Sequence, residues 1–367
     1  MRDKVAVIGA GTAGLIAAKT LCELGIGATV YDQKRRLGFP PMASGIVSIK
    51  GLEGLGIDYA RAVTNTLYGA DIHAGREVMH IMSKKPMARV LDREKLNIAC
   101  YDECVSKGAR IFTGRRLGPK DFEDLHKDNI IVGADGAVSA VARHFSMGAI
   151  RRHVLTYKAE FNVSPHDPRK VDLFFDNAVS PGLFGWMCPN GRDVLEVGVG
   201  IDSRHGNSRS AFDRLMRLGE VREAVGSAKA YGEYASIIPM RTIRHMVKEN
   251  EEVLLVGDAA GQVKPTTGGG IVFGGNAAKM AARAIRDHVE SEKRLGEYET
   301  AFMKRFGGDL AMHRAISVFC SRMGTDRLAA LVKAGKFMGA EGFLSRYGDM
   351  DRPSLMLKRF FLRGLAD

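Results

Sequence analysis

The chain begins with apolar and glycine-containing segments whose order is typical of a strand, a turn and a helix. Val5 to Ile8 is a short apolar run, long enough for a buried parallel strand. Leu15 to Leu24 has helical spacing and is followed by Gly25 and Gly27. Ala28 to Tyr31 is a second apolar run. The pattern therefore predicts a β–α–β unit at the start of the chain.

The turn of this unit has the spacing G-x-G-x-x-G, with Gly9, Gly11 and Gly14, and Asp32 ends the second strand. In dinucleotide-binding proteins the first glycine makes a tight turn, the second lets a pyrophosphate approach, and the third lets the helix pack on the strand. The helix N-terminus offers N–H groups to phosphate, and an acid at this distance accepts hydrogen bonds from a ribose. We therefore predict dinucleotide binding; the alternative is a glycine turn in another kind of strand–helix unit.

A second buried strand, from Ile130 to Val132, runs into Gly133-Ala-Asp-Gly136, and Ser139 and Arg143 follow at helical spacing. An acid held between two glycines at the end of a strand is costly unless it binds something. This favours a ligand-binding role for Asp135.

A third strand, starting at Val253, runs into Gly257 and Asp258. Pro265 and three consecutive glycines, Gly268 to Gly270, precede a helix that starts at Ile271. Glycines at a helix N-terminus are typical of backbone that lies against a phosphate or a planar ring.

Between these motifs the hydrophobic pattern changes. Alternating segments within residues 70–91 predict strands of a separate antiparallel layer, and so do residues 157–163, 171–175 and 195–201. Helices are expected over 92–107, after an N-cap aspartate, and over 208–218 and 221–225. From residue 298 onward the chain is mostly helical and basic in pattern.

The composition is that of a soluble globular protein, with 367 residues, 45% hydrophobic and 26% charged. The 54 lysines and arginines exceed the 42 aspartates and glutamates, which gives a net charge of +12. This excess suggests an anionic partner, such as a phosphorylated substrate, an acidic membrane surface or nucleic acid; the alternative is simple solubility. No RNA-binding motif supports nucleic acid. No apolar run spans a bilayer, and we expect no signal peptide.

Five cysteines are scattered along the chain, and their odd number favours reduced thiols in a cytoplasmic protein. Cys100 and Cys104 lie one helical turn apart, but no second pair completes a metal site, so we predict no metal.

Taken together, the three glycine motifs resemble those of the flavoproteins built like para-hydroxybenzoate hydroxylase. The resemblance implies one resident FAD and a transient reductant. The pyrophosphate would lie over Gly9, Gly11 and Gly14, the adenosine ribose on Asp32, and the ribityl chain or its adjacent phosphate on Asp258. The residues implied to bind the cofactor are Gly9, Gly11, Thr12, Ala13, Gly14, Asp32, Arg93, Asp135, Gly136, Gly257, Asp258, Pro265, Gly268, Gly269 and Gly270.

With this resemblance, the expected fold is α/β. It comprises a Rossmann-type FAD-binding domain, an inserted antiparallel-sheet substrate domain and a helical C-terminal region. The expected boundaries are residues 1–68, 90–150 and 240–297 for the first, 69–89 and 151–239 for the second, and 298–367 for the third.

Within this superfamily the segment from Pro181 to Pro189 resembles the Tyr-x-Trp-x-Phe-Pro motif of the geranylgeranyl reductase family. Phe184, Trp186 and Cys188 would then contact the substrate, with Phe184 and Trp186 facing one side of a strand. Two positions depart from the motif, since Phe184 replaces tyrosine and Cys188 replaces phenylalanine. The alternative is that the aromatic pair fills an interface between two sheets. A cysteine that the family often carries near Ser44 is also absent.

The resemblance implies an FAD-dependent reductase that saturates C=C bonds of a geranylgeranyl or other isoprenoid lipid. A flavin monooxygenase or halogenase of the same fold is an alternative, and so is a non-catalytic carrier of prenyl lipids. The electron donor, whether NAD(P)H or a protein such as ferredoxin, stays open, as do the exact substrate and the catalytic residues.

The tail suggests a peripheral membrane contact on the inner face of the membrane. As a helix, it places an apolar stripe of Leu357, Phe360 and Phe361, with Leu355 and Leu365 nearby, among Lys358, Arg359 and Arg363. The equally weighted alternative is a terminal helix docked on the core of the protein.

Overall fold

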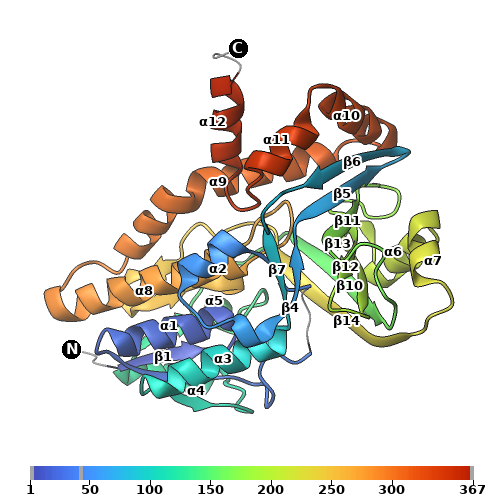
Figure 1. Cartoon of the computed structure of the whole chain (residues 1–367). Helices are drawn as coiled ribbons and strands as arrows, with labels where there is room; N and C mark the ends of the chain where they lie inside the picture. The colour runs from blue at the N-terminus through green and yellow to red at the C-terminus, as the bar shows by residue number, and fades with distance from the viewer. Residues whose placement is uncertain (1–3, 41–43, 364–367) are drawn as a thin grey trace.

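The computed structural model describes residues 4–40 and 44–363, and in the last three of these the backbone only. Three sheets and a C-terminal group of helices make up this part of the chain (Figure 1). The first sheet has the strand order β15-β16-β9-β1-β2-β8. Its strands are β1 (Lys4–Ile8), β2 (Gly27–Tyr31), β8 (Arg110–Phe112), β9 (Ile130–Gly133), β15 (Val247–Lys248) and β16 (Val253–Leu255).

The first sheet is parallel except for its edge strand β15, which pairs antiparallel with β16. Apart from the exposed Lys4 at the start of β1, its central strands β1, β9 and β16 are buried, as their continuous apolar runs predict. Helix α1 (Thr12–Glu23) contacts both α3 (Arg93–Ser106) and α8 (Ile271–Ser291). Shorter helices complete this half of the molecule: α2 (Ile49–Leu55), η1 (Ala60–Ala62), α4 (Pro119–Asp128), α5 (Ala140–His144), η3 (Glu249–Glu251) and η4 (Gly257–Ala260).

The second sheet has the strand order β14-β10-β13-β12-β11-β5-β6. Its strands are β5 (Gly69–Ala74), β6 (Glu77–Met82), β10 (His153–Phe161), β11 (Lys170–Phe174), β12 (Gly185–Pro189), β13 (Leu195–Asp202) and β14 (Ala230–Pro239). The predicted antiparallel layer is correct in all pairs but one, because β5 and β11 run parallel. That parallel pair joins segments from the two sequence ranges that were expected to form one layer.

Different elements pack on the two faces of the second sheet. Helices α6 (Ser208–Leu215) and α7 (Gly219–Val225) pack on one face through a cluster that includes Phe161, Val199 and Phe212. A small sheet of β3 (Ile46–Ser48), β7 (Ala88–Leu91) and β4 (Val63–Leu67) packs on the other face. The 3-10 turn η2 (Ser203–His205) follows β13.

The C-terminal region is helical, as predicted, with α9 (Glu297–Ser321), α10 (Thr325–Phe337), α11 (Ala340–Tyr347) and α12 (Pro353–Arg363). Helices α10 and α11 pack on β6, and α12 contacts α9. In Figure 1, α12 projects from the rest of the molecule. No helix in the described part of the chain has the length and apolarity needed to cross a membrane.

A buried ion pair lies within the second sheet. The Lys158 ammonium on β10 donates to the Glu196 carboxylate on β13 over 2.6 Å, and the Trp186 indole N–H donates to the other Glu196 oxygen over 2.9 Å. Lys158 is 3% exposed and Glu196 is 0% exposed. Burial alone would lower the pKa of Lys158, but Glu196 and Glu160 together outweigh burial and the pKa is raised. The Lys158 ammonium therefore keeps its charge inside the sheet.

We expect Glu196→Ala to lower the free energy of unfolding by about 3 kcal/mol, because it leaves the Lys158 charge and the Trp186 N–H buried without their main acceptor. Urea unfolding followed by circular dichroism measures this. Glu160→Ala is the matched control, since Glu160 lies farther from the same ammonium, at 3.5 Å, and its loss should be the smaller. Equal losses in the two variants would contradict the central role of Glu196.

Candidate flavin site

The three glycines of the first turn differ in what surrounds them. A Cβ added at Gly9 would lie 2.3 Å from the carbonyl oxygen of Ala134, and one added at Gly14 would lie 1.9 Å from that of Gly9. A Cβ at Gly11 would meet no atom within 4 Å. The first and third glycines are therefore required by the packing of the protein itself, while the second leaves an open approach to the turn. This is the arrangement that a pyrophosphate needs.

The N-terminus of α1 faces this open approach. Gly11 is its N-cap and supplies no side-chain hydrogen bond, so the first N–H groups are not capped by that residue. Thr12 donates from its hydroxyl to the Asn97 amide oxygen over 2.9 Å and accepts from Arg93 over 3.3 Å. These contacts join the turn to α3. The free N–H groups and the helix dipole favour an anion here.

Asp32 closes the turn from the neighbouring strand. Its carboxylate accepts from the Ala10 N–H over 2.6 Å and from the Lys34 N–H over 2.7 Å. Asp32 therefore fixes the backbone of the turn while standing at the carboxyl end of β2. Its contact with a ribose stays a prediction.

The opposite charges of Arg93 and Asp258 interact beside the turn. Burial raises the pKa of Asp258, and the positive charge of Arg93 offsets part of that rise. Within residues 4–40 and 44–363 the Asp258 carboxylate has no hydrogen-bond partner. A half-buried carboxylate without a donor fits a ligand that brings hydroxyl groups. Gly257, with φ of 65°, lies so close to α1 that a Cβ there would be 2.9 Å from that of Ala13.

Asp135 has a structural role that sequence reasoning missed. Its carboxylate accepts from the Ser139 hydroxyl and from the N–H groups of Ala140 and Val141, over 2.6, 2.6 and 3.1 Å. It therefore caps α5 together with Ser139. Next to it, Gly136 has φ of 87° and open space around its Cα. Contact of these two residues with a cofactor stays a prediction.

The glycine-rich loop, defined here as residues 266–270, follows the buried Pro265 and ends at α8. Gly268 has φ of 73°, and a Cβ there would lie 2.7 Å from Cδ1 of Ile238 on β14. A Cβ on Gly270 would lie 3.0 Å from an Asp258 carboxylate oxygen. The loop is thereby placed between the second sheet and Asp258. The remaining predicted position, Gly269, lies against Lys264.

The predicted substrate residues lie in the interior. Phe184 and Trp186 face the same side with ring centroids 6.3 Å apart, and both pack with Cys188 on Leu67 and Val90 of the small sheet. This is the interface packing that the sequence left open as an alternative. Burial raises the pKa of the Cys188 thiol, which keeps it protonated. Contact of the three side chains with a substrate stays a prediction.

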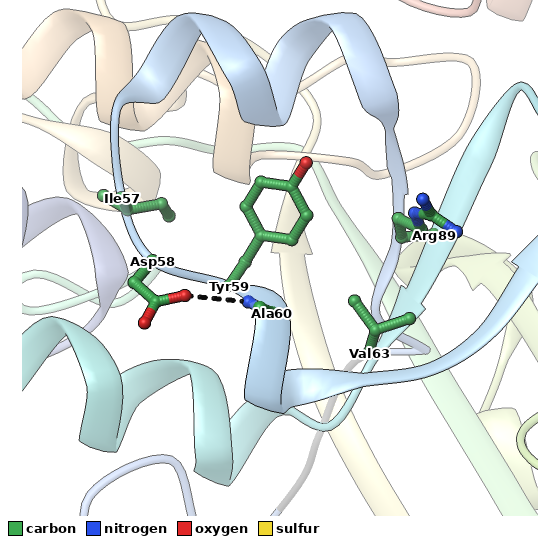
Figure 2. A pocket seen from close by; sticks show the side chains of 6 residues that line it. All are labelled: Ile57, Asp58, Tyr59, Ala60, Val63 and Arg89. Carbon is green, nitrogen blue, oxygen red and sulfur yellow. Dashed lines mark hydrogen bonds between the residues drawn. The ribbon is translucent and has the colours of Figure 1, made fainter.

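None of the predicted cofactor residues lines a cavity of about 460 Å³ formed by residues 57–60, Val63 and Arg89. Figure 2 shows the Tyr59 ring between Ile57 and Arg89, with the Asp58 carboxylate turned to the Ala60 N–H. The Arg89 Nε is buried without a partner in the described part of the chain. No pattern in the sequence pointed to this cavity.

The parallel sheet and the open glycine turn are those of a dinucleotide-binding protein. Residues 2–302 match the family described as "FAD binding domain", and the chain belongs to that family. FAD is therefore its cofactor, and it is an FAD-dependent oxidoreductase. The open turn at Gly11 and the Asp258 carboxylate, which has no hydrogen-bond partner among the described residues, fit this cofactor.

Two curated relatives align with this chain over nine-tenths of its length. Digeranylgeranylglycerophospholipid reductase 1 of Methanothermobacter thermautotrophicus is 29% identical, over 90% of this chain and 89% of its own. The digeranylgeranylglycerophospholipid reductase of Methanothrix thermoacetophila is 26% identical, over 90% and 91%.

Among solved structures, a geranylgeranyl bacteriochlorophyll reductase-like protein of Thermoplasma acidophilum has a TM-score of 0.82 at 18% identity, covering 97% of this chain and 94% of its own. The flavin-dependent brominase Bmp2 has a TM-score of 0.67 at 15% identity, covering 99% of each chain. These likenesses show the fold alone, since reductase and brominase share it.

We expect Gly11→Val to remove most of the bound FAD, because its side chain fills the open approach to the α1 N-terminus. The protein itself should fold as before, since no atom lies within 4 Å of the added Cβ. Visible absorbance of the purified variant measures the flavin. Gly219→Val, another position with no atom within 4 Å, is the matched control and should keep its colour. Full flavin occupancy in Gly11→Val would contradict the site.

Proposed function

We propose that this protein is an FAD-dependent reductase that saturates C=C bonds of a geranylgeranyl lipid. The observation that carries the proposal is the match, over nine-tenths of the chain, to proteins named for reducing digeranylgeranylglycerophospholipids. The Pro181–Pro189 segment supports it, because it resembles the substrate motif of that family. The isoprenoid nature of the substrate rests on these relatives.

In this proposal each part of the site has a physical task. Once an electron donor has reduced it, bound FAD would supply the hydride for one carbon of the C=C bond, and water or a side chain would supply the proton for the other. The α1 N-terminus and Asp32 hold its pyrophosphate and adenosine ribose, and Asp258 accepts hydrogen bonds from its ribityl chain. The glycine-rich loop lets backbone lie against the isoalloxazine ring. The apolar cluster around Phe184 and Trp186 excludes water beside the prenyl chain.

We expect anaerobic, prereduced enzyme to be reoxidised by a geranylgeranyl glycerophospholipid, because the substrate itself accepts the hydride. Stopped-flow absorbance follows the flavin, and mass spectrometry counts the hydrogens added to the lipid. The same lipid with fully saturated chains is the matched control and should leave the flavin reduced. Reoxidation that requires O₂ and gives a hydroxylated or halogenated product would instead favour a monooxygenase or halogenase.

We also propose that the C-terminal helices bind an anionic membrane surface, where such a lipid resides. On α12, Leu357 and Phe360 are 45% and 46% exposed beside the exposed Lys358 and Arg359. Phe337, at the end of α10, is 94% exposed. Helices α10, α11 and α12 lie at one end of the molecule in Figure 1. Apolar side chains among cations are typical of helices that lie in a membrane interface.

The alternative for α12, docking on the protein, accounts for part of its contacts. The Phe360 ring packs edge-on against Phe343 of α11, with centroids 5.5 Å apart, and Arg359 lies over the Tyr347 ring. The side chains of Phe361 and Arg363, and all of Leu365, lie outside the described residues. The helix is thus anchored at one side and half-exposed at another.

We expect the full chain to co-sediment with anionic vesicles in a salt-sensitive manner and to bind zwitterionic vesicles less. Lys358 and Arg359 should each contribute about 1 kcal/mol to the binding. The test variant is Lys358→Glu/Arg359→Glu, and its matched control is Lys84→Glu/Lys85→Glu, which changes two exposed lysines of the turn between β6 and β7. Unchanged binding in the α12 variant, or no binding by the full chain, would remove this role from α12.

A further inference from the structure

A buried ion pair joins the glycine-rich loop to the C-terminal region. The Lys264 ammonium donates to a carboxylate oxygen of Asp351 over 2.6 Å, although the two residues are 87 positions apart. Lys264 is 5% exposed and Asp351 is 7% exposed. The Ser48 hydroxyl donates to the second carboxylate oxygen. A pair held this way inside the protein keeps both charges.

Lys264 also organises the backbone of the loop. Its carbonyl oxygen accepts from the Gly268 N–H over 2.8 Å, and its own N–H donates to the Gly269 carbonyl over 3.1 Å. A Cβ on Gly269 would lie 2.8 Å from the Lys264 Cε and 3.3 Å from its Nζ. The ammonium therefore lies next to the backbone of Gly269, on the side where any other residue would carry its side chain.

The charges on this pair have a fixed orientation. The Asp351 carboxylate lies against Ser48 and Gly51, where a Cβ added at Gly51 would be 3.0 Å from it. On its other side the ammonium lies beside Gly269, 3.3 Å from the position of an added Cβ. The positive end of the pair thus points to the loop, and the negative end to the start of α2.

The neighbouring histidine adds no formal charge. His313 is buried, and its Nε2 lies 3.4 Å from the Asp351 carbonyl oxygen, which only accepts. Nε2 therefore carries the proton, and Nδ1 accepts from the Thr266 hydroxyl over 2.7 Å. Burial lowers the pKa of His313 to about 4, so the imidazole is neutral at neutral pH. It holds the loop in place through Thr266.

We propose that Lys264 and Asp351 are positioning residues that set the reduction potential of the bound flavin through the electric field behind the glycine-rich loop. The inference rests on the proposed placement of the isoalloxazine ring against that loop. Two-electron reduction of a flavin adds negative charge to the ring, so a nearby cation favours the reduced form and a nearby anion opposes it. Inside the protein, where water screens charges weakly, such a charge acts strongly on a nearby ring.

The test uses the opposite signs of the two charges. Asp351→Asn keeps the shape of the side chain and leaves the ammonium uncompensated, so the midpoint potential of the bound FAD should rise. Lys264→Met leaves the carboxylate uncompensated, so the potential should fall. Each is measured by anaerobic titration with reference dyes against the wild type at the same pH. The first variant is measured at mildly acidic pH and the second at mildly alkaline pH, where the unpaired group stays charged.

The pair Lys170 and Asp71, at the same distance of 2.6 Å but in the second sheet between β11 and β5, supplies the matched controls. Lys170→Met and Asp71→Asn should leave the potential unchanged. Lys264→Arg should keep it near the wild-type value. If Lys264→Met fails to fold, Asp351→Asn and the double variant Lys264→Met/Asp351→Leu decide: the potential of the first should lie above that of the wild type, and the potential of the double variant, which lacks the ammonium nearest the loop, should lie below it.

Shifts of the same sign in Asp351→Asn and Lys264→Met, or no shift in variants that bind FAD, would overturn the inference and leave a purely structural role. Failure of the proposed function looks different. If the variants show the expected opposite shifts in potential but the wild type reduces no prenyl lipid, the proposed substrate is contradicted and the field effect stands.

Discussion

Direct backbone-to-backbone contact at the first glycine turn is the constraint on which the flavin site depends. The turn after β1 touches the segment after β9, and α1 touches the turn after β16, at distances that leave no room for a Cβ. Gly274 of α8 packs on Gly257 in the same way, with an added Cβ 2.9 Å from the Gly257 Cα. Four segments far apart in the sequence therefore meet at one point. A side chain at any of these contacts would separate strands that carry Asp32, Asp135 and Asp258.

Two ion pairs are buried elsewhere in the protein. Lys158 with Glu196 and Lys264 with Asp351 each join segments that no local pattern connects. Burying such groups singly would cost several kcal/mol, so each pair fixes the relative position of its two segments. The first pair orients Trp186 in the second sheet. The second places the glycine-rich loop relative to α2 and the C-terminal helices.

Local patterns predicted the elements around the cofactor well. Continuous apolar runs identified β1, β2, β9 and β16, and the glycines identified the turns, because buried parallel strands and tight turns have strong local requirements. Strand β14 was missed because it is an edge strand whose residues before Pro239 are only exposed or half-buried and whose sequence contains a glycine. Helix α4 was missed because Phe122 is its only buried residue.

Roles that depend on tertiary contacts could not be predicted. Asp135 was interpreted as a ligand-binding acid, yet its carboxylate caps α5, and nothing in Gly-Ala-Asp-Gly distinguishes the two roles. Phe184 and Trp186 were expected to face one side of a strand, and they do, but only the small sheet packed against them decides what they meet. No pattern could pair Lys264 with Asp351 across 87 positions. Residue types and spacing thus identified FAD as the cofactor, while the buried ion pairs of the fold needed the structure.

The position of Asp351 near the end of the chain has a consequence for biosynthesis. A ribosome makes the glycine turn, the strands and the glycine-rich loop before the carboxylate that pairs with Lys264 has left the exit tunnel. Until then, the ammonium must stay in water or be buried unpaired, and burial without a partner is strongly unfavourable. The loop can therefore reach its final position only after the C-terminal region has docked. Nascent chains that stop within α11 would carry an incomplete flavin site, even though every cofactor-binding residue predicted from the sequence had already been made.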